Sequence, residues 1–442
     1  MRKLLLKNGT VINSDGVHKK DILISGNSFE KISENIPVSD NYELIDVENL
    51  YIFPGIIDTH VHFREPGLTH KATIETESKA AIAGGITSVI DMPNTLPFAD
   101  NLEKIQQKKY IAQQTSYVNI GFFVGATANN LSELINFPKN EVAGIKLFLG
   151  KSTGNVSVNK IEYLQELFQY SYLPIVVHAE NEDLIEKKIK EYKATYGKNI
   201  PFKYHCFIRS KEACLEATKM LIELAGKYNT SLHILHISTF EELELLQNFL
   251  NSNITAETCC HYLWFSNDDY EKYNGFLKCN PSIKFNTDKE KLRKFLSTDL
   301  IFSIASDHAP HTIEEKLKPY FECPSGLANI QHSFLSVLEL YHLGFISLTD
   351  IAKKMAYNPA MKFKIKKRGR IKEGYYADLA VVDLNSKTFV EKDNIFSKCK
   401  WTVFKDFTFN SKIKYTILNG KIVYENGNII ENKNSMLLDY EQ

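Results

Sequence analysis

Four polar residues alternate along the chain just before position 65, and two of them are imidazoles. Asp58, His60, His62 and Arg64 follow an apolar run at every second position. In an extended chain this spacing directs all four side chains to one face. Two imidazoles on one face at the end of a strand are suitable ligands for a metal ion. The pair alone is a weak signal, because many H-x-H pairs bind no metal.

Four further polar residues mark the C-terminal ends of other apolar runs. Lys146, His178 and His236 end such runs, and Asp307 follows one directly. In a barrel of parallel strands, these strand ends form the catalytic face. Any one of these residues could be a buried group with a polar partner. Their convergence with the histidine pair near residue 60 favours a metal site.

The types of ligand predict both the metal and a modified lysine. Four histidines with a carboxylate suit zinc. Lys146 is unusual in this set, because an ammonium group would repel the cation. A lysine buried near a metal should lose its proton, and the neutral amine can then add CO2. The resulting carbamate could bridge two ions in a binuclear site, where a shared water ionises near neutral pH. Alternatively, Lys146 pairs with Asp307 or another acid in a metal-free core.

These residues need a scaffold of parallel strands, and the middle of the chain predicts one. The strand candidates are Ile52–His60, Ile86–Asp91, Val118–Phe123, Ala143–Leu147, Pro174–His178, Leu232–His236, Asn253–Glu257 and Ile301–Ser306. The helical candidates between them include Lys71–Ala83, Glu103–Gln114, Ile161–Tyr170, Lys211–Lys227, Glu241–Phe249 and Asp288–Leu296. This α/β alternation predicts a (β/α)8 TIM barrel over residues 53–360. An open doubly wound sheet gives a similar alternation, but no Gly-rich phosphate loop follows the first strand.

The two ends of the chain resemble each other and differ from the middle. Residues 1–52 contain short β-like segments, with hairpin-forming residues at Asn8-Gly9, Asp15-Gly16 and Gly26-Asn27. Strand-like segments return in residues 361–442, where Asn419-Gly420 predicts another hairpin. We therefore predict one small β-sandwich domain built from both termini.

The charge balance and the cysteines exclude several classes of protein. Lys+Arg and Asp+Glu both number 53, so no net field attracts nucleic acid or an anionic membrane. No apolar run is long enough to span a bilayer, and the first apolar run is too short for a signal peptide. Seven cysteines without a pairing pattern are typical of a reduced protein. We expect a cytoplasmic protein that acts on a small molecule, for which a homodimer is one permitted assembly.

Beyond these patterns, a series of motifs resembles the dihydroorotases of the amidohydrolase superfamily. In order along the chain the motifs are DTHVHFREPG (58–67), GITSVIDMPNT (85–95), GIKLF (144–148), His178-Ala179-Glu180, His236-Ile237-Ser238 and SDHAPHTIEEK (306–316). Two later segments, NPA (358–360) and GRIKEGYYAD (369–378), resemble the return from such a barrel to its β-sandwich. The resemblance therefore covers nearly the whole chain. It implies reversible hydrolysis of the dihydroorotate ring, a step of pyrimidine (UMP) biosynthesis.

The resemblance also implies a division of the metal ligands between two zinc ions. One ion would be held by His60, His62 and Asp307, and the other by His178 and His236, with carboxylated Lys146 as the bridge. Asp307 would in addition be the catalytic proton shuttle. Alternatively, Asp307 is a ligand without a role in proton transfer.

A substrate site is implied as well. Arg64, Asn94 and His311 would contact the substrate carboxylate, and Asn280 would lie along the ring. The chemistry of Arg64 supports this, because a planar guanidinium binds a carboxylate through two hydrogen bonds. Alternatively, Arg64 pairs with an acid such as Glu65, and Asn94 only forms a turn.

Two other functions remain open from the sequence. Allantoinases and dihydropyrimidinases act on cyclic amides without this carboxylate, and their matching motif generally lacks the arginine. A non-catalytic barrel that serves as a scaffold should have lost metal ligands, whereas all six are present here. The charged, Gly- and Pro-containing segment 308–326 is typical of a loop over the barrel mouth.

Overall fold

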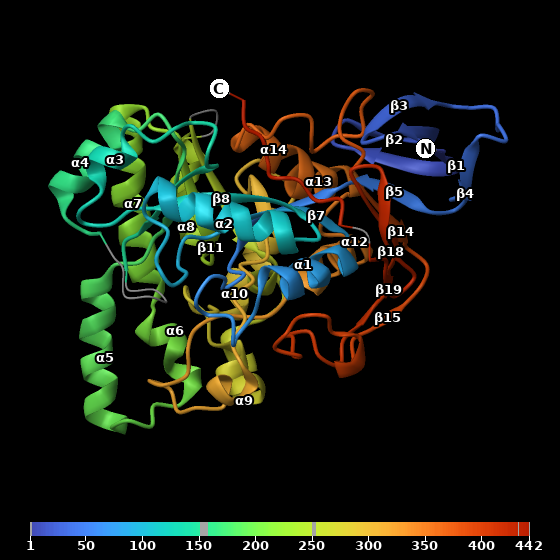
Figure 1. The fold of residues 1–442 in the computed structure, drawn as a ribbon. Helices are drawn as coiled ribbons and strands as arrows, with labels where there is room; N and C mark the ends of the chain where they lie inside the picture. The colour runs from blue at the N-terminus through green and yellow to red at the C-terminus, as the bar shows by residue number, and fades with distance from the viewer. Residues whose placement is uncertain (1, 151–157, 250–252, 432, 442) are drawn as a thin grey trace.

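The computed structural model describes residues 2–150, 158–249, 253–431 and 433–441, and it contains a barrel and a sheet lying side by side (Figure 1). The barrel is an eight-stranded parallel sheet in chain order. Its strands are β6 (Ile56–Val61), β7 (Ile86–Asp91), β8 (Asn119–Gly125), β9 (Gly144–Phe148), β10 (Ile175–His178), β11 (Leu232–Ile237), β12 (Ile254–Cys259) and β13 (Ser303–Ala305). A β-bridge between Val61 and His308 links the first and last strands. The sheet is therefore nearly closed, and the predicted TIM barrel is confirmed.

The barrel strands are buried on both faces, which explains why they are continuous apolar runs in the sequence. Helices cover the outside of the barrel (Figure 1). The longer ones are α1 (Ile74–Ala83), α2 (Leu102–Thr115), α4 (Ile161–Tyr170), α7 (Lys211–Tyr228), α8 (Phe240–Leu246), α10 (Asn286–Lys294) and α12 (Ile330–His342). Thr73 before α1 and Thr239 before α8 form capping boxes, so the start of each helix is fixed by local hydrogen bonds.

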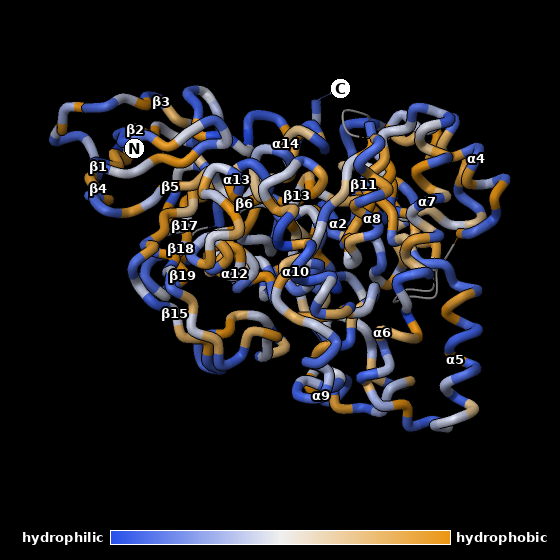
Figure 2. Tube along the Cα trace, turned by 180° about the vertical axis from the view of Figure 1, so that it is seen from behind, coloured by the Kyte–Doolittle hydropathy of each residue, from blue (hydrophilic) through white to orange (hydrophobic). Residues whose placement is uncertain are grey.

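Several helices fall outside the predicted set. The largest of these, α5 (Glu182–Tyr196), projects from the barrel, and most of its residues are hydrophilic (Figure 2). Only Ile185 of α5 is buried. The short helices are α3 (Leu131–Leu134), α6 (His205–Ile208), α9 (Tyr270–Tyr273), α11 (Ile313–Lys316), α13 (Leu348–Ala352) and α14 (Asn358–Lys362). No helix in the described ranges has both the length and the apolar character needed to cross a membrane.

Strands from both ends of the chain form one nine-stranded sheet, as expected for a composite unit. The N-terminal strands are β1 (Lys3–Asn13), β2 (Gly16–Ser25), β3 (Ser28–Ser33), β4 (Tyr42–Asp46) and β5 (Tyr51–Pro54). The C-terminal strands are β14 (Leu379–Asp383), β17 (Lys412–Leu418), β18 (Lys421–Glu425) and β19 (Asn428–Ile429), while β15 (Thr388–Phe389) and β16 (Thr408–Phe409) pair separately. β5 joins the two sets, because it pairs with β1 on one side and β14 on the other.

Two details differ from the sequence prediction. The expected strand Ile52–His60 is divided at Gly55 into β5 of the composite sheet and β6 of the barrel. A side chain at Gly55 would come within 2.1 Å of Thr87 Oγ1, so only glycine allows this close passage. Asn8-Gly9 is not a hairpin but a bulge inside β1, where Asn8 has φ of 66°. The other three predicted turns do connect neighbouring strands.

The end of the barrel opposite the strand C-termini is filled by apolar side chains. A buried cluster contains Ile57, Phe123 and Val176 from three barrel strands, together with Leu438 and Tyr440. The segment that contributes the last two residues forms a β-bridge between Leu437 and Ile120 of β8. This end of the barrel, the floor, therefore contains a buried apolar cluster.

Candidate metal and substrate site

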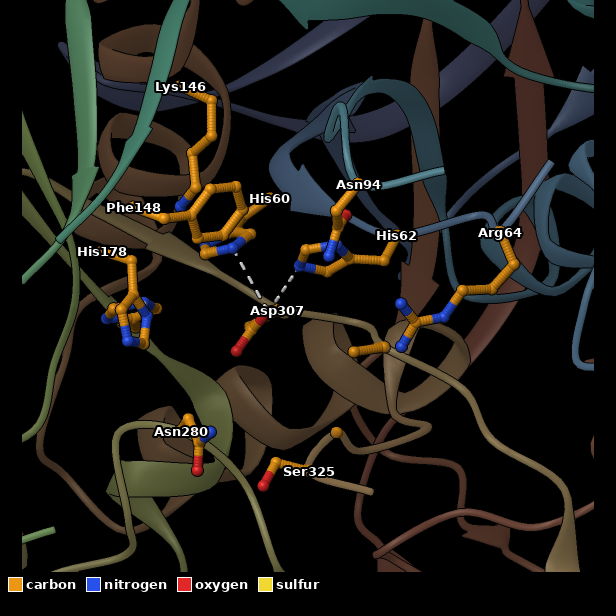
Figure 3. Close-up of a pocket in the computed structure, with 13 residues that line it drawn as sticks. His60, His62, Arg64, Asn94, Lys146, Phe148, His178, Asn280, Asp307 and Ser325 are labelled. Atoms are coloured by element: carbon orange, nitrogen blue, oxygen red, sulfur yellow. Dashed lines mark hydrogen bonds and ion pairs between the residues drawn. The ribbon is translucent and has the colours of Figure 1, made fainter. Parts of the chain in front are cut away.

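The polar residues predicted at the strand ends line one pocket at the mouth of the barrel (Figure 3). All six predicted metal ligands are present in its wall: His60, His62, Lys146, His178, His236 and Asp307. Arg64, Asn94 and Asn280 line the same pocket, together with Phe148, Ala309, Ser325 and Gly326. His311 is not in the wall and lies behind Arg64.

The tightest group in this pocket consists of His60, His62 and Asp307. The Nε2 atoms of both imidazoles lie 3.2 Å from the same carboxylate oxygen, Asp307 Oδ1 (Figure 3). All three side chains are buried, and their ligand atoms lie within 4.8 Å of one another. A divalent cation accepts this combination of nitrogen and oxygen donors.

The second nitrogen of each imidazole also has a polar partner. His60 Nδ1–H donates to Glu257 at 2.7 Å, and His62 Nδ1–H donates to Asn94 Oδ1 at 2.6 Å. A neutral ring held in this way turns the lone pair of its Nε2 toward Asp307, and a cation between them would remove the repulsion. Burial also lowers the pKa of His62 to about 4, so this ring is neutral at pH 7. The residues fit a metal ion.

His178 and His236 form the second histidine pair. His178 Nδ1 lies 2.8 Å from His236 Nε2, and the two rings meet edge to face with centroids 4.7 Å apart. Burial lowers the pKa of both imidazoles, which favours the neutral, ligating form. On its other side, His178 Nε2 lies 2.9 Å from the carboxylate of Glu180, which in turn pairs with Arg209. The carboxylate of Glu180 thus lies beside the His178 ring, as that of Glu257 lies beside the His60 ring.

Lys146 lies on β9, with its ammonium group 4.5 Å from the centre of the Phe148 ring. Among the described residues it forms no ion pair, in contrast to the alternative in which it pairs with an acid. Burial lowers the pKa of Lys146 to about 7, although the negative charges of Asp307 and Glu257 act in the opposite direction. A substantial fraction of this amine is therefore neutral at pH 7, as carbamate formation requires.

Three residues of the site have left-handed backbone conformations. The φ angles are 67° at Arg64, 45° at His236 and 46° at Asp307. None of these residues is glycine, so each conformation costs about 1–3 kcal/mol and is held by its surroundings. Arg64 lies beyond the end of β6, which finishes at Val61. This turn, rather than the strand alternation expected from the sequence, brings Arg64 to the pocket.

The guanidinium of Arg64 is buried, and only two of its three nitrogens have a polar partner among the described residues. Its Nε–H donates to the carbonyl oxygen of Pro310 at 3.1 Å, and Nη2 lies 3.1 Å from His311 Nε2. Nη1 has no hydrogen-bond partner among the described residues, although it is inaccessible to solvent. Burial lowers the pKa of Arg64 to about 10, which still leaves it charged at pH 7. An unpaired buried cation in a pocket wall is suited to an anionic group of a ligand.

The remaining predicted residues occupy different positions around the pocket. Asn280 Oδ1 is buried without a hydrogen-bond partner in the described structure. His311 contacts Arg64 on one side, and its Nδ1 lies 2.9 Å from Lys71 Nζ on the other. Asp58 does not line the pocket, because its carboxylate accepts the backbone N–H groups of His60 and Ser306. It thereby joins β6 to the segment after β13.

Glu257 is the functional residue that the sequence reasoning missed. It lies on β12 and accepts hydrogen bonds from His60 and from Thr59 Oγ1, while His233 Nε2 lies 3.4 Å away. Burial would raise the pKa of Glu257, but the hydrogen bonds from His233 and His60 lower it to about 2. Glu257 ends the predicted strand Asn253–Glu257, as His178 ends its own strand. This position could have identified it as a candidate site residue.

Comparisons with known proteins agree with this geometry. The amidohydrolase family model matches residues 51–423. A dihydroorotase of Methanosphaera stadtmanae is 32% identical over 439 residues, which cover 97% of this chain and 98% of that protein. An allantoinase of Desulfitobacterium hafniense is also 32% identical, over 97% of this chain and 96% of that protein. Dihydroorotases are therefore among its relatives, as the motifs indicated.

The solved structures lead to the same group. An L-hydantoinase (dihydropyrimidinase) from Arthrobacter aurescens superposes with a TM-score of 0.94 at 26% identity, over 99% of this chain and 100% of that one. The range matched by the family model begins at β5, just before the first barrel strand, and ends in β18 of the composite sheet. It includes His60, His62 and Asp307. The chain belongs to the amidohydrolase family and is a cyclic amidohydrolase.

Proposed function

We propose that this protein is a zinc-dependent dihydroorotase that interconverts L-dihydroorotate and N-carbamoyl-L-aspartate in pyrimidine synthesis. The observation that carries the proposal is Arg64. Its Nη1 is a buried, charged donor without a partner among the described residues, in the wall of the metal pocket. A substrate with a carboxylate beside its cyclic amide satisfies this donor, and dihydroorotate has that combination.

The ligand set supports two metal ions at this site. His60, His62 and Asp307 would hold one ion, His178 and His236 the other, and Lys146 would bridge them as a carbamate. When bound, the ions would polarise the ring carbonyl and lower the pKa of water at the site.

The side chains of the chain itself would then bind substrate and move the proton. Arg64 holds the carboxylate, and His311 acts through Arg64, whose orientation it fixes. Asn94 contacts the same carboxylate. Asn280 lies along the ring, where its Oδ1, which has no hydrogen-bond partner among the described residues, can accept a ring N–H. Asp307 takes a proton from the attacking water and returns it to the ring nitrogen as the amide bond breaks. The imidazoles of His60 and His62 lower the pKa of Asp307 against the effect of burial, so it starts as a carboxylate.

A panel of cyclic amides tests the proposal. The purified, zinc-loaded protein with bicarbonate should turn over dihydroorotate and carbamoyl-aspartate, and it should leave allantoin, hydantoin and dihydrouracil nearly unchanged. Activity confined to allantoin would instead assign the function of the allantoinase relatives, which are equally similar in sequence.

An arginine variant tests the observation itself. Arg64→Met removes the fork and keeps most of the side-chain length, and it should reduce kcat/KM for dihydroorotate by roughly 10²–10³-fold. Arg370→Ala is the matched control, because Arg370 lies on the surface and pairs with Asp15. Full dihydroorotate turnover by Arg64→Met would refute the proposal.

A further inference from the structure

A second pocket, here called the basic pocket, lies between the segment around α9 and residues 392–406. Four of its lining residues are lysines, Lys272, Lys392, Lys400 and Lys405, and three are aromatic, Tyr273, Phe276 and Trp401. Its volume of about 420 Å³ is within the range of small-molecule sites, roughly 300–1,000 Å³. It shares no lining residue with the metal pocket.

The base of the basic pocket is apolar. Trp401 is buried and meets Phe276 edge to face, with ring centroids 5.1 Å apart. Its indole N–H donates to the carbonyl oxygen of His311 at 2.7 Å, which fixes the plane of the ring. Ile313 and Ile395 complete this surface. Such a base accommodates a flat ring and provides few polar groups of its own.

The rim of the basic pocket is strongly positive, although the whole chain has no net charge. Lys400 Nζ donates to the carbonyl oxygen of Ile395, and Lys272 Nζ lies 3.2 Å from the hydroxyl of Tyr273. Asp406 is the one acid in the lining, and its charge acts on Lys272 together with that of Asp269. Within the described ranges, none of the four ammonium groups is paired with a carboxylate. The rim therefore presents excess positive charge above an aromatic base.

From this combination we infer that the basic pocket binds a nucleoside monophosphate, with the base against Trp401 and Phe276 and the phosphate among the lysines. A phosphate group can contact several ammonium groups at once. The aromatic base of the pocket supplies the apolar contact that inorganic phosphate alone would not use.

The basic pocket is connected to the metal pocket through two short paths. Trp401 holds the backbone of His311, whose ring contacts Arg64. Lys316 Nζ lies 5.8 Å from the Trp401 ring centre and donates to the carbonyl oxygen of Gly326, a residue of the metal pocket wall. A nucleotide against Trp401 would therefore act on Arg64 and on this wall. The predicted effect on turnover rests on the proposed function, whereas the binding itself does not.

Binding is tested on the zinc-loaded protein by calorimetry with UMP, uridine and inorganic phosphate. UMP should bind, and uridine and phosphate should each bind at least about tenfold more weakly. The chain has two tryptophans, so a Trp264→Phe variant leaves Trp401 as the only indole reporter, and UMP should change its fluorescence. UMP should also change KM for dihydroorotate. If the protein does not turn over dihydroorotate, the binding measurements still decide the inference.

A pair of double variants locates the site. Lys392→Ala/Lys405→Ala should weaken UMP binding by about tenfold, since two phosphate contacts are removed. Lys19→Ala/Lys31→Ala removes the same charge from exposed positions of the composite sheet and should leave UMP binding unchanged. The inference is overturned if Trp401 fluorescence does not respond to UMP, if phosphate binds as tightly as UMP, or if both double variants bind UMP like the wild type.

Discussion

The two ends of the barrel contain opposite kinds of core. At the mouth, buried imidazoles, carboxylates and a lysine face one another, and three residues have left-handed backbones. At the floor, Phe123, Val176 and Leu235 belong to one buried apolar cluster with Leu438 and Tyr440. The same strands supply both ends. Buried ionisable groups and left-handed backbones are thus gathered at the mouth, whereas the floor holds an apolar cluster.

The largest effect on zinc content and turnover is expected when one lysine at each end of the barrel is replaced in turn. Lys146→Ala at the mouth should reduce both zinc content and turnover, the latter by roughly 10³-fold or more, because a bridging ligand is lost. Lys362, near the floor, donates to the carbonyl oxygen of Leu232 and is the matched control. Lys362→Met should retain zinc. Zinc content is measured by elemental analysis, beside turnover. An equal loss of zinc from the two variants would contradict the contrast between mouth and floor.

A floor residue should show the converse behaviour. Phe123 is fully buried and meets Phe363 edge to face at 5.4 Å. Phe123→Ala should lower the free energy of unfolding by about 3–5 kcal/mol through the cavity that it leaves. Zinc affinity of the folded fraction should stay near that of the wild type. Urea unfolding with a zinc titration measures both quantities, and a large loss of zinc affinity would show that the two ends are coupled.

Within the mouth, Glu257 tests whether a residue that does not line the pocket supports zinc binding through His60. Glu257→Gln should weaken zinc binding by roughly 10–100-fold, because the amide no longer orients His60 with a negative charge. Glu242→Gln is the control, since Glu242 is also buried but contacts Thr218 and Thr239 away from the pocket. Competition with a zinc chelator measures the affinities. Equal affinities for the two variants would mean that Glu257 only fills space.

The smallest effect is expected for a buried histidine outside the pocket, His332, whose replacement should change only the pH dependence of stability. His332 on α12 is buried, and burial lowers its pKa to about 3. Below pH 6.5 the imidazole is protonated in the unfolded chain but stays neutral in the folded chain. The free energy of unfolding therefore falls by about 1.4 kcal/mol per pH unit as the pH decreases toward 3. His332→Leu should remove this component, which is measured as a shallower slope of unfolding free energy between pH 5 and 6. An unchanged slope would assign the acid sensitivity to the histidines of the mouth.

The sequence predicted the barrel, and it predicted the residues that meet at the barrel mouth, because both depend on local patterns. His178 and His236 lie at or next to the ends of β10 and β11, and parallel strands bring such ends together whatever the details of the loops. Lys146, expected at a strand end, lies in the middle of β9 and still lines the pocket. The bend at Gly55 and the bulge at Asn8 were not predictable, because they depend on contacts with Thr87 and on the register of β1 with β2.

Residue contacts across the barrel were also beyond the sequence. Glu257 lies almost two hundred positions from His60, and no spacing rule connects them. His311 was expected to contact substrate, and the structure places it against Arg64 instead of in the pocket wall. The motif identified the neighbourhood of this residue, whereas its packing partner depends on the turn at Arg64.

The bridge between Val61 and His308 has a consequence for how the protein is made. The strands that close the ring lie near opposite ends of the barrel segment, so closure has a high contact order and is slow. During synthesis a nascent chain holds His60 and His62 long before Asp307 leaves the ribosome. A zinc ion held by these three residues would therefore bind only after Asp307 has joined the ring, too late to guide the early steps of folding.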